Sequence, residues 1–141
     1  MPYREKTAWL SLMAMALTFG PYFTLSGMGY LPETALPNWN QLGLYAKTAL
    51  SQVALLGIGH LYLRHQSPVE ARIPPDERDQ NIMLRARTLA YYMLMAGMIF
   101  VGVVMPFTKS GWQITNAALF MIIVAEVVYY SGVVFCYRKS A

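Results

Sequence analysis

One acidic residue stands inside a long apolar segment in the second half of the chain. Glu126 is the single acid between Gln113 and Phe135, and it lies thirteen residues after the start of that segment. A helix rises about 1.5 Å per residue, so Glu126 lies roughly 20 Å from the end, near the middle of a bilayer. A carboxylate there costs about 3 kcal/mol, so we expect it to be protonated, paired or exposed to a wet cavity. Glu126 is therefore a candidate proton or substrate site.

The alternative is a structural role, in which a neutral Glu126 hydrogen-bonds to a tyrosine or threonine of a neighbouring helix. The sequence leaves the two roles evenly balanced. Tyr22 lies at a similar depth and is the best-matched donor, and Tyr130 belongs to the same candidate site. Lys47 lies near the outer end of its segment, so we expect its long side chain to extend to the lipid headgroups rather than inward to Glu126.

Two histidines, His60 and His65, offer the only imidazole ligands. We expect His60 to face the protein interior near the inner membrane surface, within the candidate intramembrane site. The two histidines are five residues apart on adjoining faces of a helix, so they cannot bind one haem iron from opposite sides. Neither has a cysteine or carboxylate at ligand spacing within its segment. The sequence therefore predicts no metal and no cofactor, and the single Cys136 excludes an intrachain disulfide.

A second group of candidate residues lies in the polar segment from Ser67 to Arg87. Two prolines precede Asp76, which is a good helix N-cap with Asp79 three residues later, so a helix is predicted to begin here. None of the four charged residues from Asp76 to Asp79 has an opposite charge four residues later along the predicted helix. We therefore expect Glu77 and Arg78 to pair with another loop, a terminus or a protein partner. A capped, charged helix start with no further role is the structural alternative.

The same segment carries a resemblance to a protein family. Its pattern Pro-x-Asp-Glu-Arg-Asp-x-x-Ile, formed by Pro74, Asp76, Glu77, Arg78, Asp79 and Ile82, precedes an apolar segment. It resembles uncharacterised small four-span bacterial inner-membrane proteins with an Asp-Glu-Arg motif in a cytoplasmic loop. The run from Glu5 to Trp9 is similar to the start of some of them. Some of these proteins look like companions of small transcription regulators, so the resemblance implies a role in sensing or immunity.

Four segments are long and apolar enough to position these residues as membrane-spanning helices. They are Thr7 to Leu31, Leu42 to Leu63, Thr88 to Phe107 and Gln113 to Phe135. The chain is 56% hydrophobic and 13% charged, against about 25% charged in soluble domains. The sequence predicts an all-α fold: a single transmembrane four-helix bundle over residues 1–141, with short outer loops and one longer loop over 64–87. Gly20-Pro21 should bend the first helix.

The basic residues predict how the chain is threaded. Nine of the eleven Lys and Arg residues fall in the N-terminus, the loop 64–87 and the C-terminus. The positive-inside rule places these three regions in the cytoplasm, in a multi-pass protein of the cell inner membrane. The loop has five bases and four acids, so it is a poor polyanion binder. The basic residues behind the net charge of +4 are therefore expected to set the membrane topology and to contact anionic lipid. No nucleic-acid partner is expected.

Small residues recur at helical spacing in two of the spans: Ala118, Ala125 and Gly132 in the fourth, and Ala46, Ala49 and Gly57 in the second. Small side chains let membrane helices approach closely. We expect both sets to pack inside one bundle, and the alternative is a seam between two copies in a homo-oligomer.

These observations favour a non-enzymatic inner-membrane protein that acts through its cytoplasmic loop as a sensor, immunity factor or accessory subunit. The alternative is a small proton-coupled transporter that uses Glu126. Small multidrug exporters share this size and plan, but their essential glutamate lies in the first span. Membrane enzymes need clustered His, Asp, Arg or Lys side chains, and the spans contain no such cluster.

Overall fold

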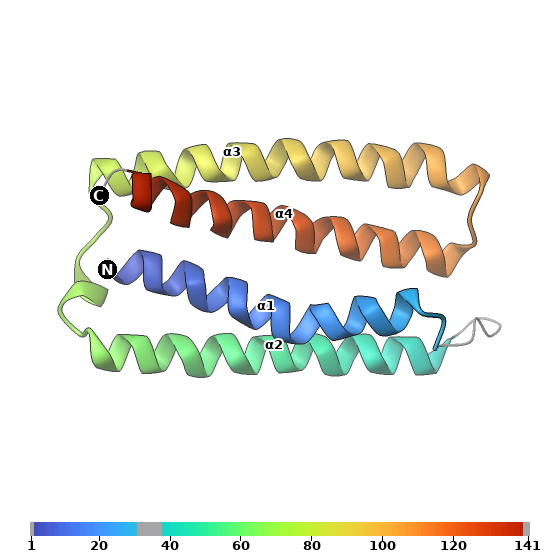
Figure 1. The fold of residues 1–141 in the computed structure, drawn as a ribbon, viewed down its shortest axis with the longest axis horizontal. Coiled ribbons are helices and arrows are strands. Elements are labelled where there is room, and N and C mark those ends of the chain that lie inside the picture. The colour runs from blue at the N-terminus through green and yellow to red at the C-terminus, as the bar shows by residue number, and fades with distance from the viewer. Residues whose placement is uncertain (1, 31–37, 140–141) are drawn as a thin grey trace.

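Four long helices make up most of the protein in the computed structural model, which describes residues 2–30 and 38–139 (Figure 1). They are α1 (Tyr3–Gly27), α2 (Trp39–Gln66), α3 (Glu77–Ile99) and α4 (Gly111–Lys139). Three short elements accompany them: the 3₁₀ turn η1 (Glu70–Arg72), the π-helical turn η2 (Phe100–Val104) and the 3₁₀ turn η3 (Met105–Phe107). All four helices, α3 with its extension to Phe107, are long and apolar enough to span a membrane. The predicted all-α four-helix bundle is confirmed.

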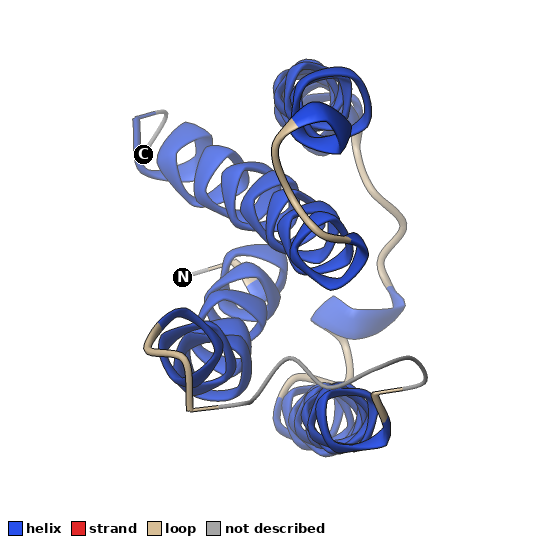
Figure 2. Ribbon diagram, turned by 90° about the vertical axis from the view of Figure 1, so that its right-hand side faces the viewer, coloured by secondary structure: helices blue, strands red, loops and turns tan. Residues whose placement is uncertain are grey.

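The helices are arranged in the order α2, α1, α4, α3. The central pair, α1 and α4, pack against each other, while α2 packs mainly on α1 and α3 packs on α4 (Figure 2). Much of α2 therefore has no protein neighbour in the described residues, and Leu50 and Val53 are 70% and 68% exposed. Apolar surface of this kind is what a membrane helix presents to lipid tails.

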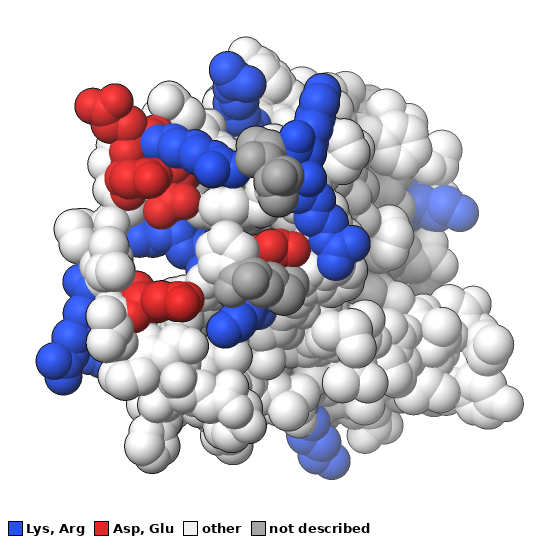
Figure 3. All heavy atoms as spheres, turned by 60° about the vertical axis from the view of Figure 1, so that its left-hand side comes forward, with Lys and Arg blue, Asp and Glu red and all other residues white. Residues whose placement is uncertain are grey.

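Both termini and the loop between α2 and α3 lie at one end of the bundle, as the predicted threading requires (Figure 1). We call this the charged end, because the acidic and basic side chains gather there (Figure 3). The connection from α3 to α4 lies at the opposite end, which we call the outer end.

The helix ends differ from the predicted spans for identifiable reasons. α1 ends at Gly27, earlier than the predicted Leu31, which lies outside the described residues. The backbone N–H of Tyr30 donates to the Leu25 carbonyl, and Gly29 adopts a φ of 71° that favours glycine, so a left-handed cap stops the helix. As predicted, Pro21 lies inside α1, and the helix is bent (Figure 1).

The third helix begins as its sequence predicts and ends irregularly. The Asp76 carboxylate accepts a hydrogen bond from the backbone N–H of Asp79 at 2.6 Å, which confirms the predicted N-cap. At the other end, Pro106 has no N–H to donate to the Gly102 carbonyl. The last turns therefore depart from the α pattern, and η2 and η3 take the place of regular helix.

The small residues pack as predicted in α4 but not in α2. A Cβ at Gly132 would lie 3.3 Å from the Ala86 Cβ, so α3 and α4 are in close contact there. In α2, a Cβ at Gly57 would meet no atom within 4 Å, and Ala46 is exposed. The prediction that Ala46 and Gly57 pack inside the bundle is wrong, because α2 turns Gly59 toward Leu10 of α1 instead.

Candidate functional site

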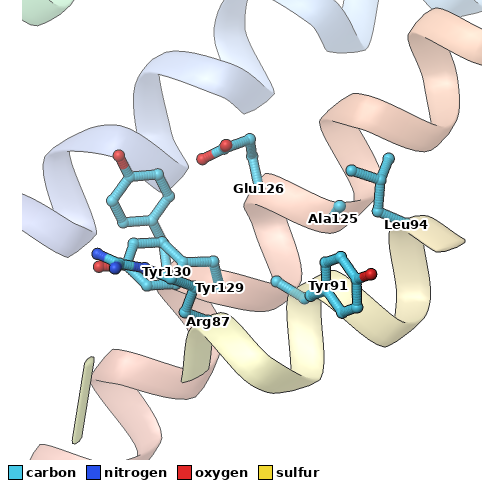
Figure 4. A pocket seen from close by; sticks show the side chains of 8 residues that line it. Arg87, Tyr91, Leu94, Ala125, Glu126, Tyr129 and Tyr130 are labelled. Atoms are coloured by element: carbon cyan, nitrogen blue, oxygen red, sulfur yellow. The ribbon is translucent and has the colours of Figure 1, made fainter. Parts of the chain in front are cut away.

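Glu126 lies in a groove between α3 and α4 of about 440 Å³. Figure 4 shows the side chains that line it: Glu126, Tyr129 and Tyr130 from α4, and Arg87, Tyr91 and Leu94 from α3. The Glu126 side chain is exposed in the groove rather than packed between helices. The floor is the α3–α4 seam, where Ala90 and Ala125 are buried. A carboxylate and three tyrosine rings therefore share one open site.

Arg87 brings a second ionisable group to this groove. The pairing of Ala86 with Gly132, and of Gly97 with Met121, places Glu126 level with residue 92 of the antiparallel α3. Arg87 is five residues from that level, or about 7.5 Å nearer the charged end. Both side chains line the groove, and no salt bridge joins Arg87 to Glu126 among the described residues.

Tyr22 does not pair with Glu126, so this prediction is wrong. The Tyr22 hydroxyl donates to Asn116 Oδ1 at 2.7 Å, and the Asn116 amide donates to Ser26 Oγ at 2.9 Å. Asn116 lies ten residues before Glu126, about 15 Å along α4. Tyr22 is 2% exposed and joins α1 to α4 in the outer half of the bundle. Tyr130, by contrast, shares the groove with Glu126, and its hydroxyl approaches Ser11 of α1.

A further polar contact lies near the middle of α2. Thr18 of α1 hydrogen-bonds to the side-chain oxygen of Gln52 at 2.6 Å. Gln52 is only 7% exposed, and its amide nitrogen has no hydrogen-bond partner. This contact joins α1 to α2 and is separate from the Glu126 groove.

Lys47 and His60 both lie on α2, and neither lines the groove of Glu126. Lys47 is exposed and forms no salt bridge within the described part of the chain, as expected for a side chain directed away from Glu126. His60 is also exposed, and its Nδ1 lies 2.8 Å from the Leu56 carbonyl of its own helix. The expectation that His60 faces the interior is wrong, because α2 turns that face away from α1.

At the charged end, Asp79 joins three helices. Arg4 Nε lies 2.9 Å from Asp79 Oδ2, and the Tyr137 hydroxyl donates to Asp79 Oδ1. Arg4 also donates to the Ile73 carbonyl at 3.3 Å, which holds the loop before α3. We call Arg4, Asp79 and Tyr137 the clasp. It connects the first turns of α1 and α3 to the last turns of α4.

A second ion pair lies beside the clasp. Arg138 Nε is 3.4 Å from Glu5 Oε1, and the Arg138 guanidinium lies 5.4 Å from the centre of the Trp9 ring. Glu5 is 7% exposed, so its carboxylate needs this charged partner. The start of α1 and the end of α4 are thus held together by two sets of polar contacts.

The four predicted loop residues therefore serve different purposes. Asp76 caps α3 and Asp79 forms the clasp, while Glu77 and Arg78 line another groove between α3 and α4. No group of three or more His, Cys, Asp or Glu side chains that would hold a metal ion occurs in residues 2–30 and 38–139.

Arg87, Tyr91, Arg4 and Tyr137 were not among the site residues predicted from the sequence. A signal for two of them was present: Arg87, Tyr91 and Leu94 are spaced at i, i+4 and i+7, which places them on one face of a helix. For Arg4 and Tyr137 the chain offered no local signal, because their partner Asp79 is remote in sequence.

Comparison with protein-family models, curated protein sequences and solved structures finds no significant match to this chain. The function proposed below therefore rests on the residues of this chain and their geometry.

Proposed function

We propose that this protein is a non-enzymatic, proton-coupled transporter that binds a lipophilic cation at Glu126. The observation that carries the proposal is the shared groove of Glu126, Tyr91, Tyr129 and Tyr130. Tyrosine faces attract cations, and a carboxylate supplies the opposite charge in a medium that solvates ions poorly. The volume of about 440 Å³ lies within the range of small-molecule sites.

Proton coupling follows from the position of Glu126. In the middle of a membrane, the carboxyl group is stable when it carries a proton or is paired with a cation, and the two states exclude each other. Arg87 adds a positive charge to the same groove but forms no salt bridge with Glu126 in the described residues, so the carboxyl group is available to a proton or a cation. Binding of a cation on one side of the membrane would then release a proton, and binding of a proton would release the cation.

Transport in proteoliposomes tests this function. Tetraphenylphosphonium is a suitable probe. An outwardly directed proton gradient should drive its uptake through the wild type, and this uptake should be lost when Glu126→Gln removes the ionisable group. Glu70→Gln is the matched control, since Glu70 is an exposed acid at the charged end and should leave transport unchanged. Equal transport by wild type and Glu126→Gln, or none by the wild type, would reject the proposal.

The clasp favours a second function, that of a sensor, immunity factor or accessory subunit. Because Asp79 contacts both Arg4 and Tyr137, a protein partner that competes for Asp79 would loosen α1, α3 and α4 together. Pull-down from detergent tests this role with Glu77→Ala and Arg78→Ala, because a partner that reaches Asp79 would also contact these two exposed residues just before it. A specific partner should be captured by the wild type and lost in these variants, and capture of none would rule this role out.

For either function, we propose that the protein lies in the inner membrane of the cell, with its charged end in the cytoplasm. The excess of Lys and Arg at that end supports this orientation. A reporter enzyme that is active only outside the cytoplasm should be active when fused at Lys109 and inactive when fused at the C-terminus.

A further inference from the structure

A second groove between α3 and α4 opens at the charged end and has a volume of about 530 Å³. Its cationic side chains come from two helices: Arg78 and Arg85 from the start of α3, and Lys139 from the end of α4. Arg78 and Arg85 are seven residues apart, so they project from the same face of α3. Ile82, which is 7% exposed, lies between them and gives the groove an apolar floor.

The groove carries a net positive charge. Its three cations are opposed by one lining carboxylate, Glu77. Two other acids at this end are engaged outside the groove, since Asp79 pairs with Arg4 and Glu5 pairs with Arg138. Neither Arg85 nor Lys139 forms a salt bridge within the residues that the structure describes. Two exposed cations therefore face the groove without a carboxylate partner.

The depth of these two cations matches the phosphate layer of a membrane. About 20 residues cross the hydrocarbon core, and on α4 we take its edge at Phe135, where the apolar segment ends. Lys139 then lies roughly 6 Å beyond this edge. The register of α3 on α4 places Arg85 level with residue 133, about 3 Å inside the edge, from where its long side chain extends outward to the phosphates. The interfacial layer on each side is about 5 to 7 Å thick.

The geometry points to a binding site for the phosphate group of an anionic phospholipid. Guanidinium groups bind phosphate oxygens in a bidentate way, and the Lys139 ammonium adds a mobile point charge. Basic pockets between membrane helices are suited to lipid phosphates, which the bilayer presents at this depth. The apolar floor at Ile82 accommodates the glycerol and the start of an acyl chain. The net positive charge selects against the ammonium group of a zwitterionic lipid.

Native mass spectrometry of the full chain in detergent tests this site with phosphatidylglycerol and phosphatidylcholine as probes. We expect retention of phosphatidylglycerol and much weaker retention of phosphatidylcholine. The double variant Arg85→Ala/Lys139→Ala should bind phosphatidylglycerol about 30-fold more weakly, because each basic residue near a membrane surface contributes roughly a factor of five. The exposed positions of both residues should leave helix content unchanged by circular dichroism.

The matched control is Arg64→Ala/Arg72→Ala, which removes the same charge from exposed positions at the same end but outside the groove. It should keep the wild-type lipid affinity. Equal losses in the two double variants would show a diffuse charge effect and overturn the site. Equal retention of phosphatidylcholine, or displacement of phosphatidylglycerol by inorganic phosphate, would overturn its assignment to an anionic lipid. If Arg85→Ala/Lys139→Ala loses helix content, Arg85→Gln/Lys139→Gln repeats the test with longer polar side chains.

Discussion

Arg4 and Asp79 form a salt bridge of 2.9 Å that joins the first turn of α1 to the first turn of α3. Both side chains are partly shielded from solvent, and Asp79 also accepts a hydrogen bond from Tyr137 of α4. One carboxylate thus holds together the ends of three helices. The Asp-Glu-Arg-Asp segment is therefore part of the architecture at the charged end, in addition to any role in binding a partner.

Loss of the Asp79 side chain should destabilise the protein. Asp79→Ala removes the partner of Arg4 and leaves the Tyr137 hydroxyl, in a residue only 5% exposed, without its acceptor. Because hydrogen bonds to charged groups contribute about 1.5 to 3 kcal/mol, we expect a loss of about 2 to 3 kcal/mol in the free energy of unfolding. Thermal unfolding in detergent measures it. Glu70→Ala, at an exposed acid beside the clasp, should change stability by less than about 0.5 kcal/mol.

The contact between α3 and α4 at Gly132 should not tolerate a larger side chain. Gly132→Val places branched carbons where a Cβ alone would already lie 3.3 Å from Ala86. Overpacking of this kind costs about 1 to 3 kcal/mol. Gly57→Val is the control, since no atom lies within 4 Å of a Cβ at Gly57. Unfolding measurements that show the same loss for both variants would contradict the close α3–α4 contact.

Loss of the Thr18 hydroxyl alone should lower the free energy of unfolding, whereas replacing both Thr18 and Gln52 by apolar residues should not. Thr18→Val leaves the whole amide of a buried Gln52 without a partner, and we expect a loss of about 1 kcal/mol. The double variant Thr18→Val/Gln52→Leu removes both polar groups and should be close to wild type, because no buried donor or acceptor is left. Unfolding of the two variants in detergent provides the comparison. A double variant that is less stable than Thr18→Val would contradict this account.

The sequence predicts the helices well because length and apolar content decide whether a segment can span a membrane. The cap at Asp76 was also predictable, since it depends on residues only three apart. The rotation of each helix about its own axis was not predictable from the sequence. Both faces of α2 are apolar, so its sequence does not show that Gln52 and Gly59 face α1 while His60 and Gly57 face outward.

The same limit applies to the candidate site. Tyr22 and Glu126 were matched by depth, but the direction of each side chain around its helix decides the contact, and Tyr22 meets Asn116 instead. The inclusion of Arg87 and Tyr91 in the groove of Glu126 depends on the register between α3 and α4. Close packing at Gly132 and Gly97 sets that register, and no local pattern in either helix specifies it.

The most direct measurement of the proposed function is proton release when tetraphenylphosphonium binds to the purified protein in weakly buffered detergent solution. If one carboxyl group holds either a proton or the cation, the wild type should release about one proton per cation bound. Glu126→Gln should release none, while Glu70→Gln should behave as the wild type does. Cation binding without proton release, or equal release from Glu126→Gln, would contradict a proton-coupled site at Glu126.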